Sequence, residues 1–308
     1  MEWIIQIGLL VIGFVMLVKG ADYFVDGAAG IAAKFGIPQL VIGLTIVAFG
    51  TSAPEAAVSL TAAFKGSAEI TIGNVVGSNI LNILIILGLT ALIVPLHVKK
   101  STVFFEMPYV IIVSILLAVL GLPDGVVGFG DGVLLWACMI LFLLYLLKLA
   151  KEGEEQEEAG EERKPWVLPF MVFGGLAVVI FGSHITVDSA TAMAKMLHVD
   201  ERIIGLTIVA LGTSLPELVT SVTAGIKGNA DIAVGNIVGS NIFNILFVVG
   251  TTALITPVEY AGSFLPDSLA CIGAAILLWG FALWGRVLTR IGGVIMLLCY
   301  GAYLAYLL

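Results

Sequence analysis

The amino-acid sequence predicts an all-α membrane protein with ten transmembrane helices in two inverted five-helix repeats. Three observations lead to this fold class: an apolar composition, recurring long apolar runs, and a duplicated sequence pattern. Of the 308 residues, 60% are hydrophobic and only 12% are charged. Soluble domains carry about 25% charged residues, so most of this chain must face lipid or other apolar helices.

Ten apolar segments are each long enough to cross a hydrocarbon core about 30 Å thick as a helix. The first follows Glu2 and lacks a preceding basic stretch, which indicates a spanning helix rather than a cleaved signal peptide. The predicted spans are residues 3–26, 38–64, 69–94, 102–121, 127–148, 166–190, 201–226, 231–255, 265–284 and 290–308.

The two halves of the chain are related in sequence. Without gaps, residues 42–95 match residues 204–257 at about 35 of 54 positions. The predicted organisation is therefore a first five-helix repeat over residues 1–150, an acidic loop over 151–165 and a second five-helix repeat over 166–308. Because each repeat has an odd number of spans, the second must enter the membrane from the opposite side, which makes the repeat inverted.

The basic residues predict the orientation of these spans. If the loop 151–165, which carries seven glutamates, is cytoplasmic, then eleven of the 14 Lys and Arg residues lie on the cytoplasmic side. Only Lys65, Lys195 and Arg202 lie on the other side. Positive residues concentrate in cytoplasmic loops, so we expect both termini to be extracellular.

A duplicated acidic motif interrupts two of the apolar runs. Residues 50–55 read Gly-Thr-Ser-Ala-Pro-Glu, and residues 212–217 read Gly-Thr-Ser-Leu-Pro-Glu. Proline lacks an N–H and clashes with the carbonyl four residues back, so carbonyl oxygens are freed there. A carboxylate inside a span is costly and marks a functional site. Each copy supplies hard oxygen ligands, which suit Na⁺ or Ca²⁺: Thr51, Ser52 and Glu55, and Thr213, Ser214 and Glu217.

The segments that follow each carry a polar stripe. Residues 73–82 and 235–244 share the pattern Gly-Asn-x-x-Gly-Ser-Asn-x-x-Asn. Spacing by four places Asn74, Ser78 and Asn82 on one helix face, and likewise Asn236, Ser240 and Asn244. Amide and hydroxyl oxygens from these stripes would complete a coordination shell without adding charge. The glycines four residues apart allow neighbouring helices to approach closely.

Structural interpretations of the same residues stay open. A proline in a span is often only a kink, and Ser or Asn stripes can form interhelical hydrogen bonds without touching an ion. Asn79 and Asn241 point off the main stripes, which favours that structural role. Asp26 and Asp188 correspond across the repeat and lie near span ends, where an interfacial or capping role is favoured.

With these motifs the chain resembles the cation/calcium antiporter superfamily, and within it the sodium/calcium exchanger type. It looks like a compact prokaryotic member, so the resemblance implies an integral protein of a prokaryotic cell membrane that exchanges Na⁺ for Ca²⁺ by alternating access. Exchange of three Na⁺ for one Ca²⁺ would be electrogenic. The transported ions and the lipid bilayer are the expected partners; we expect no prosthetic group, no nucleic acid and no obligate protein partner.

The resemblance also implies a set of ligands. Carried over by motif position, Ca²⁺ would bind the carboxylates of Glu55 and Glu217 and the carbonyls of Thr51 and Thr213. Flanking Na⁺ sites would add the carbonyls of Ala48 and Ala210 and the hydroxyls of Ser52, Ser214, Ser78 and Ser240.

Two departures from the superfamily pattern refine the expected activity. Potassium-dependent members need an acid where this chain has Asn82 or Asn244, which argues against K⁺ co-transport. The proton-coupled branch carries a Glu in its Gly-Asn motif, whereas residues 73–77 read Gly-Asn-Val-Val-Gly. A Ca²⁺/H⁺ antiporter remains the nearer alternative, and a cation channel the other. No enzyme is expected, because HExxH and GxSxG motifs are absent and Ser52 and Ser214 lack a neighbouring base.

Overall fold

The computed structural model describes residues 2–65, 68–152, 166–197 and 210–307. Within these residues, eight helices are long and apolar enough to cross a membrane, or nine if one bent pair is counted as a single span. The chain is therefore an all-helical membrane protein, as predicted. The predicted span 201–226 is described only from residue 210 onward, and most of the loop 151–165 lies outside the described residues.

The first half of the chain begins with α1 (Glu2–Phe35). A bent span follows, made of α2 (Gln39–Ile42), the π-helix η1 (Gly43–Val47), α3 (Ala48–Thr51) and α4 (Ala53–Phe64). The next spans are α5 (Glu69–Leu81) with the π-helix η2 (Asn82–Leu87) and α6 (Gly88–Ile93), then the π-helix η3 (Thr102–Glu106) with α7 (Met107–Gly121), and finally α8 (Phe129–Glu152).

The second half has the same order of elements. It contains α9 (Val167–Met196), α11 (Ala210–Thr213), α12 (Leu215–Ile226), α13 (Ala230–Phe243), the π-helix η5 (Asn244–Val249) and α14 (Gly250–Ile255). The 3₁₀-helix η6 (Gly262–Phe264), α15 (Leu265–Leu283) and α16 (Arg290–Leu307) complete it. The long helices α1 and α9 extend beyond the predicted spans 3–26 and 166–190, because no proline interrupts residues 27–35 or 191–196.

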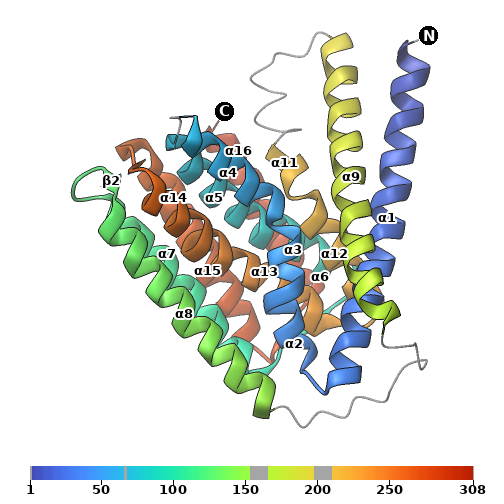
Figure 1. Cartoon of the computed structure of the whole chain (residues 1–308), viewed down its shortest axis with the longest axis horizontal. Coiled ribbons are helices and arrows are strands. Elements are labelled where there is room, and N and C mark those ends of the chain that lie inside the picture. The colour runs from blue at the N-terminus through green and yellow to red at the C-terminus, as the bar shows by residue number, and fades with distance from the viewer. Residues whose placement is uncertain (1, 66–67, 153–165, 198–209, 308) are drawn as a thin grey trace.

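Helices α1 and α9 form an antiparallel pair beside the other helices (Figure 1). Glycines bring their backbones together: a Cβ added at Gly175 would lie 2.6 Å from the Phe24 nitrogen, and one at Gly20 would lie 2.8 Å from the Val179 nitrogen. Gly13 likewise lies against Gly182. Close approach of small residues is how helices associate in lipid, where no hydrophobic effect drives them together.

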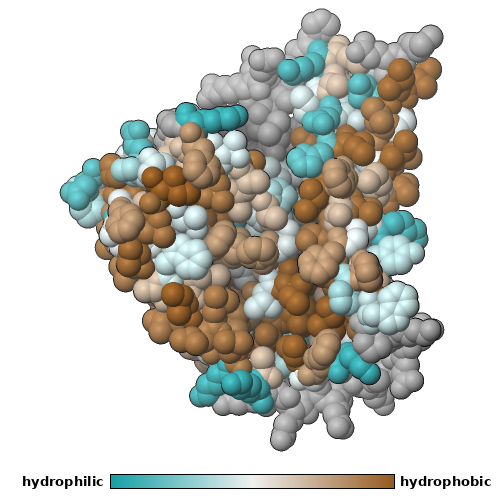
Figure 2. Space-filling model, viewed as in Figure 1, coloured by the Kyte–Doolittle hydropathy of each residue, from teal (hydrophilic) through white to brown (hydrophobic). Residues whose placement is uncertain are grey.

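The polar motifs lie on the most buried helices. In the span from α13 to α14, 94% of the most apolar stretch is buried, against 22% for α8 and 17% for α16. Figure 2 shows apolar side chains over much of one face of the molecule, with most polar residues near its edges. The outer helices thus present apolar faces to lipid, while α5 and α13 are enclosed by protein.

Two short strand pairs connect the halves at their loops. Strand β1 (Leu96–His97) pairs antiparallel with β4 (Val287–Leu288), and β2 (Val126–Val127) pairs antiparallel with β3 (Val258–Glu259). Each pair joins one strand from the first half with one from the second. The pairs satisfy backbone hydrogen bonds where the chain leaves the helices.

The glycine contact between α1 and α9 predicts a position-specific effect on stability. Gly175→Ala places its Cβ against the backbone of Phe24, which cannot move aside easily, so we expect a loss of about 1–3 kcal/mol in the free energy of unfolding. Gly174→Ala is the matched control, because an added Cβ there meets no atom within 4 Å. Thermal unfolding in detergent measures both variants, and equal stability of the two would contradict this packing.

Candidate cation site

Each duplicated motif breaks its helix at the serine. Ser52 (φ −81°, ψ 4°) separates α3 from α4, and Ser214 (φ −91°, ψ 4°) separates α11 from α12. The first break bends the span by 47°. Pro54 and Pro216 stand in the first turns of α4 and α12, where a missing N–H costs nothing. The breaks put Glu55 and Glu217 in first turns, whose free N–H groups favour negative charge.

The two glutamates are buried and hydrogen-bonded across the halves. Each side chain is only 1% exposed. The Ser52 hydroxyl donates to Oε1 of Glu217 at 2.9 Å, and the Ser214 hydroxyl donates to Oε1 of Glu55 at 3.2 Å. Each carboxylate is therefore held by the serine of the other repeat, not by the serine three residues before it. This pairing across the halves was not predictable from residue spacing, because spacing within one motif contains no information on how the halves meet.

Several buried oxygen atoms at this centre have no hydrogen-bond donor. They are Oε2 of Glu55, Oε2 of Glu217, Oδ1 of Asn82 and Oδ1 of Asn244. Among the described residues, no Lys or Arg forms an ion pair with either glutamate. A buried carboxylate without a partner is strongly unfavourable. Because all four atoms are hard oxygen acceptors, a bound Na⁺ or Ca²⁺ is the kind of partner that suits them.

Four asparagines form hydrogen bonds between the two central spans, which contain α5 and α13. Nδ2 of Asn79 donates to the Asn241 carbonyl and Nδ2 of Asn241 donates to the Asn79 carbonyl, each at 3.2 Å. Asn82 donates to Oδ1 of Asn241 at 3.0 Å, and Asn244 donates to Oδ1 of Asn79 at 3.1 Å. The structural role favoured for Asn79 and Asn241 is confirmed. Asn82 and Asn244 use only their amide nitrogens here, which leaves their oxygens available.

A second set of polar contacts supports the broken helices from behind. Asn236 donates to the Ser221 hydroxyl at 2.9 Å and to the Glu217 carbonyl at 3.4 Å. Asn74 makes the corresponding contacts, at 3.0 Å to the Ser59 hydroxyl and 3.2 Å to the Glu55 carbonyl. These two serines were not among the predicted site residues. Their signal was a hydroxyl at matching positions of both repeats.

The remaining predicted ligands occupy different surroundings. The Ala48 carbonyl accepts from the Ser52 N–H at 3.1 Å and lies 3.4 Å from the Ser240 hydroxyl. The Thr51 hydroxyl lies 2.9 Å from Oδ1 of Asn236. Of the others, Ser78 is buried, Thr213 is partly exposed, and Ala210 begins α11 with its side chain outside the described part of the chain.

The helix stripes also differ in their packing. A Cβ added at Gly239 would lie 2.9 Å from the Leu44 backbone, and one at Gly235 would lie 3.1 Å from Gly43, so α13 packs tightly against η1. This confirms the close approach predicted for the second stripe. The segment that corresponds to η1 in the second half falls in residues 198–209, outside the described residues, so the approach at Gly73 and Gly77 stays a prediction.

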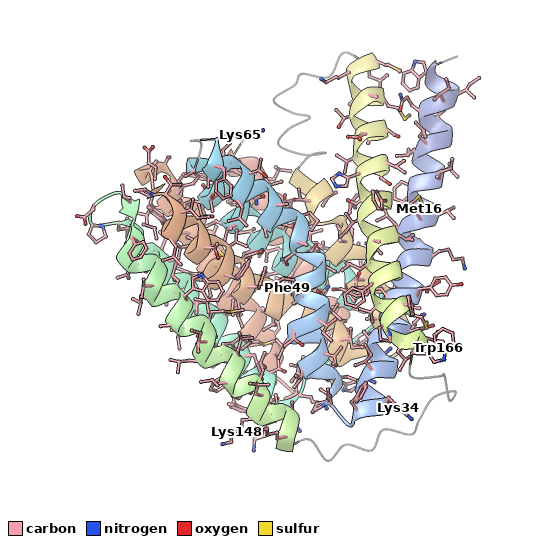
Figure 3. All side chains as sticks on the ribbon, viewed as in Figure 1. Met16, Lys34, Phe49, Lys65, Lys148 and Trp166 are labelled. Atoms are coloured by element: carbon pink, nitrogen blue, oxygen red, sulfur yellow. The ribbon has the colours of Figure 1, made fainter. Side chains whose placement is uncertain are left out.

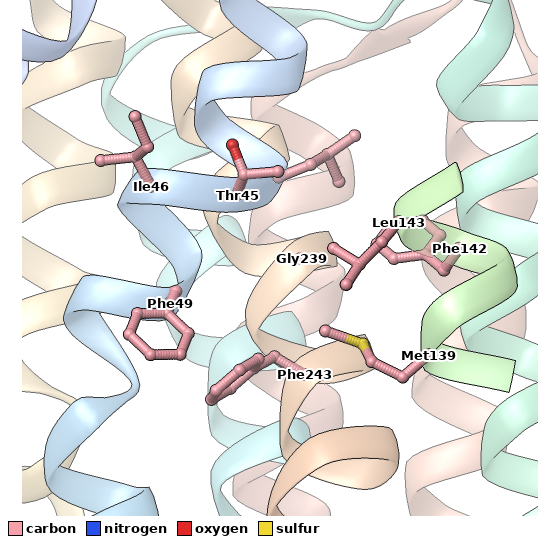
Figure 4. Close-up of a pocket in the computed structure, with 9 residues that line it drawn as sticks. Thr45, Ile46, Phe49, Met139, Phe142, Leu143, Gly239 and Phe243 are labelled. Carbon is pink, nitrogen blue, oxygen red and sulfur yellow. The ribbon is translucent and has the colours of Figure 1, made fainter. Parts of the chain in front are cut away.

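A cavity of about 280 Å³ lies apart from the glutamates (Figure 4). Carbon atoms dominate its lining, which includes Phe49, Met139, Phe142 and Phe243 between the bent span, α8 and α13. Phe49 is exposed on the outer surface. This cavity suits an apolar side chain or lipid chain, and it offers no ligand set for a cation.

Broken helices around two buried carboxylates, inside a shell of apolar spans, define a membrane protein that binds cations. Comparison with known proteins gives the family. The family described as sodium/calcium exchanger protein matches residues 5–149 and 167–308. The chain therefore belongs to the sodium/calcium exchanger family, and it is a transporter rather than an enzyme.

Individual relatives agree with this assignment over nearly the whole chain. The inner membrane protein YrbG of Escherichia coli is 39% identical, with 88% of each chain covered. The sodium/calcium exchanger MaX1 of Methanosarcina acetivorans is 34% identical, with 97% of each covered. A solved structure of the sodium-calcium exchanger NCX_Mj, soaked with 10 mM Na⁺ and zero Ca²⁺, superimposes with a TM-score of 0.85 at 32% identity, covering 98% of this chain and 99% of that one.

The asparagine contacts predict a change in stability at the centre. Asn79→Ala removes two side-chain hydrogen bonds and leaves the Asn244 side-chain amide without its acceptor, whereas the Asn241 carbonyl still accepts from the Asn244 N–H. Each unpaired buried group costs about 1–3 kcal/mol, so the melting temperature should fall clearly. Thr71→Val is the matched control on α5, because the Thr71 hydroxyl is buried without a partner and its removal should be neutral or stabilising. A larger loss in Thr71→Val than in Asn79→Ala would contradict the network.

Proposed function

We propose that this protein exchanges Na⁺ for Ca²⁺ across a membrane by alternating access, without K⁺ and with net movement of charge. One observation carries the proposal: two buried carboxylates, each hydrogen-bonded to a serine of the other half, keep one oxygen without a donor. Such a pair has a charge near −2, which one Ca²⁺ neutralises. Na⁺ ions that bind the same carboxylates compete with Ca²⁺, and competition for one site is what an antiporter requires.

The proposed ligands are those of the two motifs and their stripes. Glu55 and Glu217 contact both kinds of ion, and the asparagine oxygens without donors lie on the adjoining helices. The Na⁺ sites flank the Ca²⁺ site on either side of the carboxylates. The full proposed set is Glu55, Glu217, Thr51, Thr213, Ser52, Ser214, Ala48, Ala210, Ser78, Ser240, Asn82 and Asn244.

The architecture that we propose is ten helices in two inverted repeats, with both termini on the extracellular side. Support for the inversion comes from α1 and α9, which correspond in sequence and pack antiparallel: Gly13 meets Gly182, and Gly20 meets Gly175. A two-fold axis that relates antiparallel helices is perpendicular to them, so it lies in the membrane plane when the helices cross it. Two inverted halves supply two states of similar energy that open to opposite sides.

Unequal burial of corresponding residues supports access from one side at a time. Thr51 and Asn236 are fully buried, whereas their counterparts Thr213 and Asn74 are partly exposed. The ligands toward one end of the molecule are therefore sealed, and those toward the other end are nearer to solvent. Exchange of the sealed and open ends would carry bound ions across.

The carboxylate pair predicts which variants lose transport. Glu55→Gln or Glu217→Gln keeps the shape of the side chain but removes the charge that binds Ca²⁺, so Ca²⁺ uptake by proteoliposomes should fall at least about 100-fold, as expected for a loss of roughly 3 kcal/mol of ion binding. Glu106→Gln is the matched control: Glu106 is also buried in a span, but it accepts a hydrogen bond from Tyr145, away from the two motifs. Full uptake by either motif variant would overturn the proposed site.

The coupling ion is tested with vesicles loaded with Na⁺ and with vesicles that carry only a pH gradient. Outward Na⁺ should drive Ca²⁺ uptake, and replacing K⁺ by choline on both sides should leave the rate unchanged. Uptake driven by the pH gradient alone would move the protein to the Ca²⁺/H⁺ branch. Uptake that needs K⁺ would show that Asn82 and Asn244 do not prevent K⁺ co-transport.

Charge movement is tested by setting the membrane potential in the same vesicles. Exchange of three Na⁺ for one Ca²⁺ moves one charge, and the potential contributes about 2.3 kcal/mol per charge for each 100 mV. Exit of three Na⁺ with entry of one Ca²⁺ moves one positive charge out of the vesicle. An inside-positive potential should therefore speed Ca²⁺ uptake, and an inside-negative potential should slow it. A rate that does not respond to voltage indicates electroneutral exchange.

A further inference from the structure

One group of charged residues takes no part in the proposed cation site. At the end of α12, Lys227 Nζ lies 2.6 Å from Oδ1 of Asp26 and 3.3 Å from Oδ1 of Asp22, both on α1. The same nitrogen lies 3.1 Å from the Asp22 carbonyl. The side chains are partly exposed, between 27% and 36%. One lysine thus joins α1 to α12, the helix whose first turn contains Glu217.

The duplicated sequence gives this group a counterpart. At the spacing of 162 residues that relates the motifs, Lys227 corresponds to Lys65 at the end of α4, and Asp26 corresponds to Asp188 on α9. The second aspartate is not repeated: Asp22 corresponds to His184. The charges needed for one equivalent ion pair are therefore present at the other end of the molecule.

The counterpart pair is not formed in this arrangement of helices. Among the described residues, α1 packs along α12, but α9 does not pack along α4 in the same way. Lys65 and Asp188 are both exposed, and no ion pair joins them in the described part of the chain. Figure 3 shows Lys65 at the end of α4, well apart from α9.

We propose that Lys227 and the two aspartates of α1 form one of two alternating latches. The second latch pairs Lys65 with Asp188 and forms only in the opposite state. Applying the pseudo-two-fold axis to this structure exchanges the halves, so the contact of α1 with α12 becomes a contact of α9 with α4. These residues position the α1–α9 pair relative to the cation site and do not contact the ions. The inference rests on the proposed alternating access.

The two latches should differ in strength. The first has two carboxylates for one lysine, whereas the second has one carboxylate, because His184 stands where the other aspartate would be. Partly exposed ion pairs shift an equilibrium by about twofold to fivefold each. The state in which α1 packs on α12 should therefore be favoured in the absence of ions.

Distances between spin labels test the latches directly. In a chain whose three free cysteines, Cys138, Cys271 and Cys299, are replaced by Ala, labels are attached through Phe64→Cys on α4 and Phe181→Cys on α9. Both phenylalanines are exposed, at 75% and 63%. Pulsed electron paramagnetic resonance in lipid nanodiscs gives the distance distribution, in which packing of α9 on α4 shortens the label separation.

The variants should shift the two populations in opposite directions. Lys227→Ala and Asp26→Asn weaken the first latch, so the short-distance population should rise about twofold to fivefold. His184→Asp adds a carboxylate to the second latch and should raise it too, whereas Asp188→Asn should lower it. Lys34→Ala is the matched control, since it removes an exposed lysine near the same end of α1 and should change nothing.

The outcomes separate the latch from the proposed function. The latch would be overturned by distance distributions that stay unchanged in all three variants, Lys227→Ala, Asp26→Asn and His184→Asp. This holds even when the labelled protein takes up Ca²⁺ in exchange for Na⁺. Populations that shift as expected in a protein without Na⁺-driven Ca²⁺ uptake would overturn the proposed function and keep the latch. A shift of the same size in Lys34→Ala would also overturn the latch, because the effect would then reflect net charge alone.

Discussion

Two carboxylates are buried inside the broken spans, and the rest of the structure must stabilise them there. Neither Glu55 nor Glu217 has a basic partner among the described residues, and each has one oxygen without a donor. The helix breaks at Ser52 and Ser214 meet part of that requirement by putting the glutamates at helix N-termini and by supplying one hydroxyl to each. In the proposed function, a bound cation supplies the rest. Outer helices such as α8 and α16 then isolate this centre from lipid.

Structural and binding tasks fall on different residues of the same stripes. The side-chain amides of Asn79 and Asn241 each donate to the backbone carbonyl of the other, so hydrogen bonds join α5 to α13 without an ion. Asn82 and Asn244 donate into that network and keep their oxygens free. Contacts at the centre obey the internal symmetry, whereas Thr51 and Thr213 differ in burial. The symmetry therefore holds for the hydrogen bonds of the glutamates and asparagines and fails for the burial of the two threonines.

Much of the fold was predictable from the sequence, because membranes restrict what a chain can do. Apolar runs, the proline in each motif and the constant spacing of 162 residues indicated the spans, the breaks and the repeat. The partners across the repeat were not predictable: the bond of Ser52 to Glu217 depends on how the halves meet. The π-helices that begin at Asn82 and Asn244 had no signal of their own, since their residues continue the apolar runs of the predicted spans. The short strands, of two residues each, had none either.

The exchange of serines between the glutamates has a consequence for the two halves of the chain. Each half of the chain contains a carboxylate but not the hydroxyl that holds it, so one half cannot complete this pair of contacts by itself. Because α1 and α9 run antiparallel, two identical halves could meet in this way only when inserted in opposite directions. Two separate copies of one half could therefore complete such a site only as an antiparallel pair, whereas their union in one chain allows the two copies to differ, as His184 differs from Asp22.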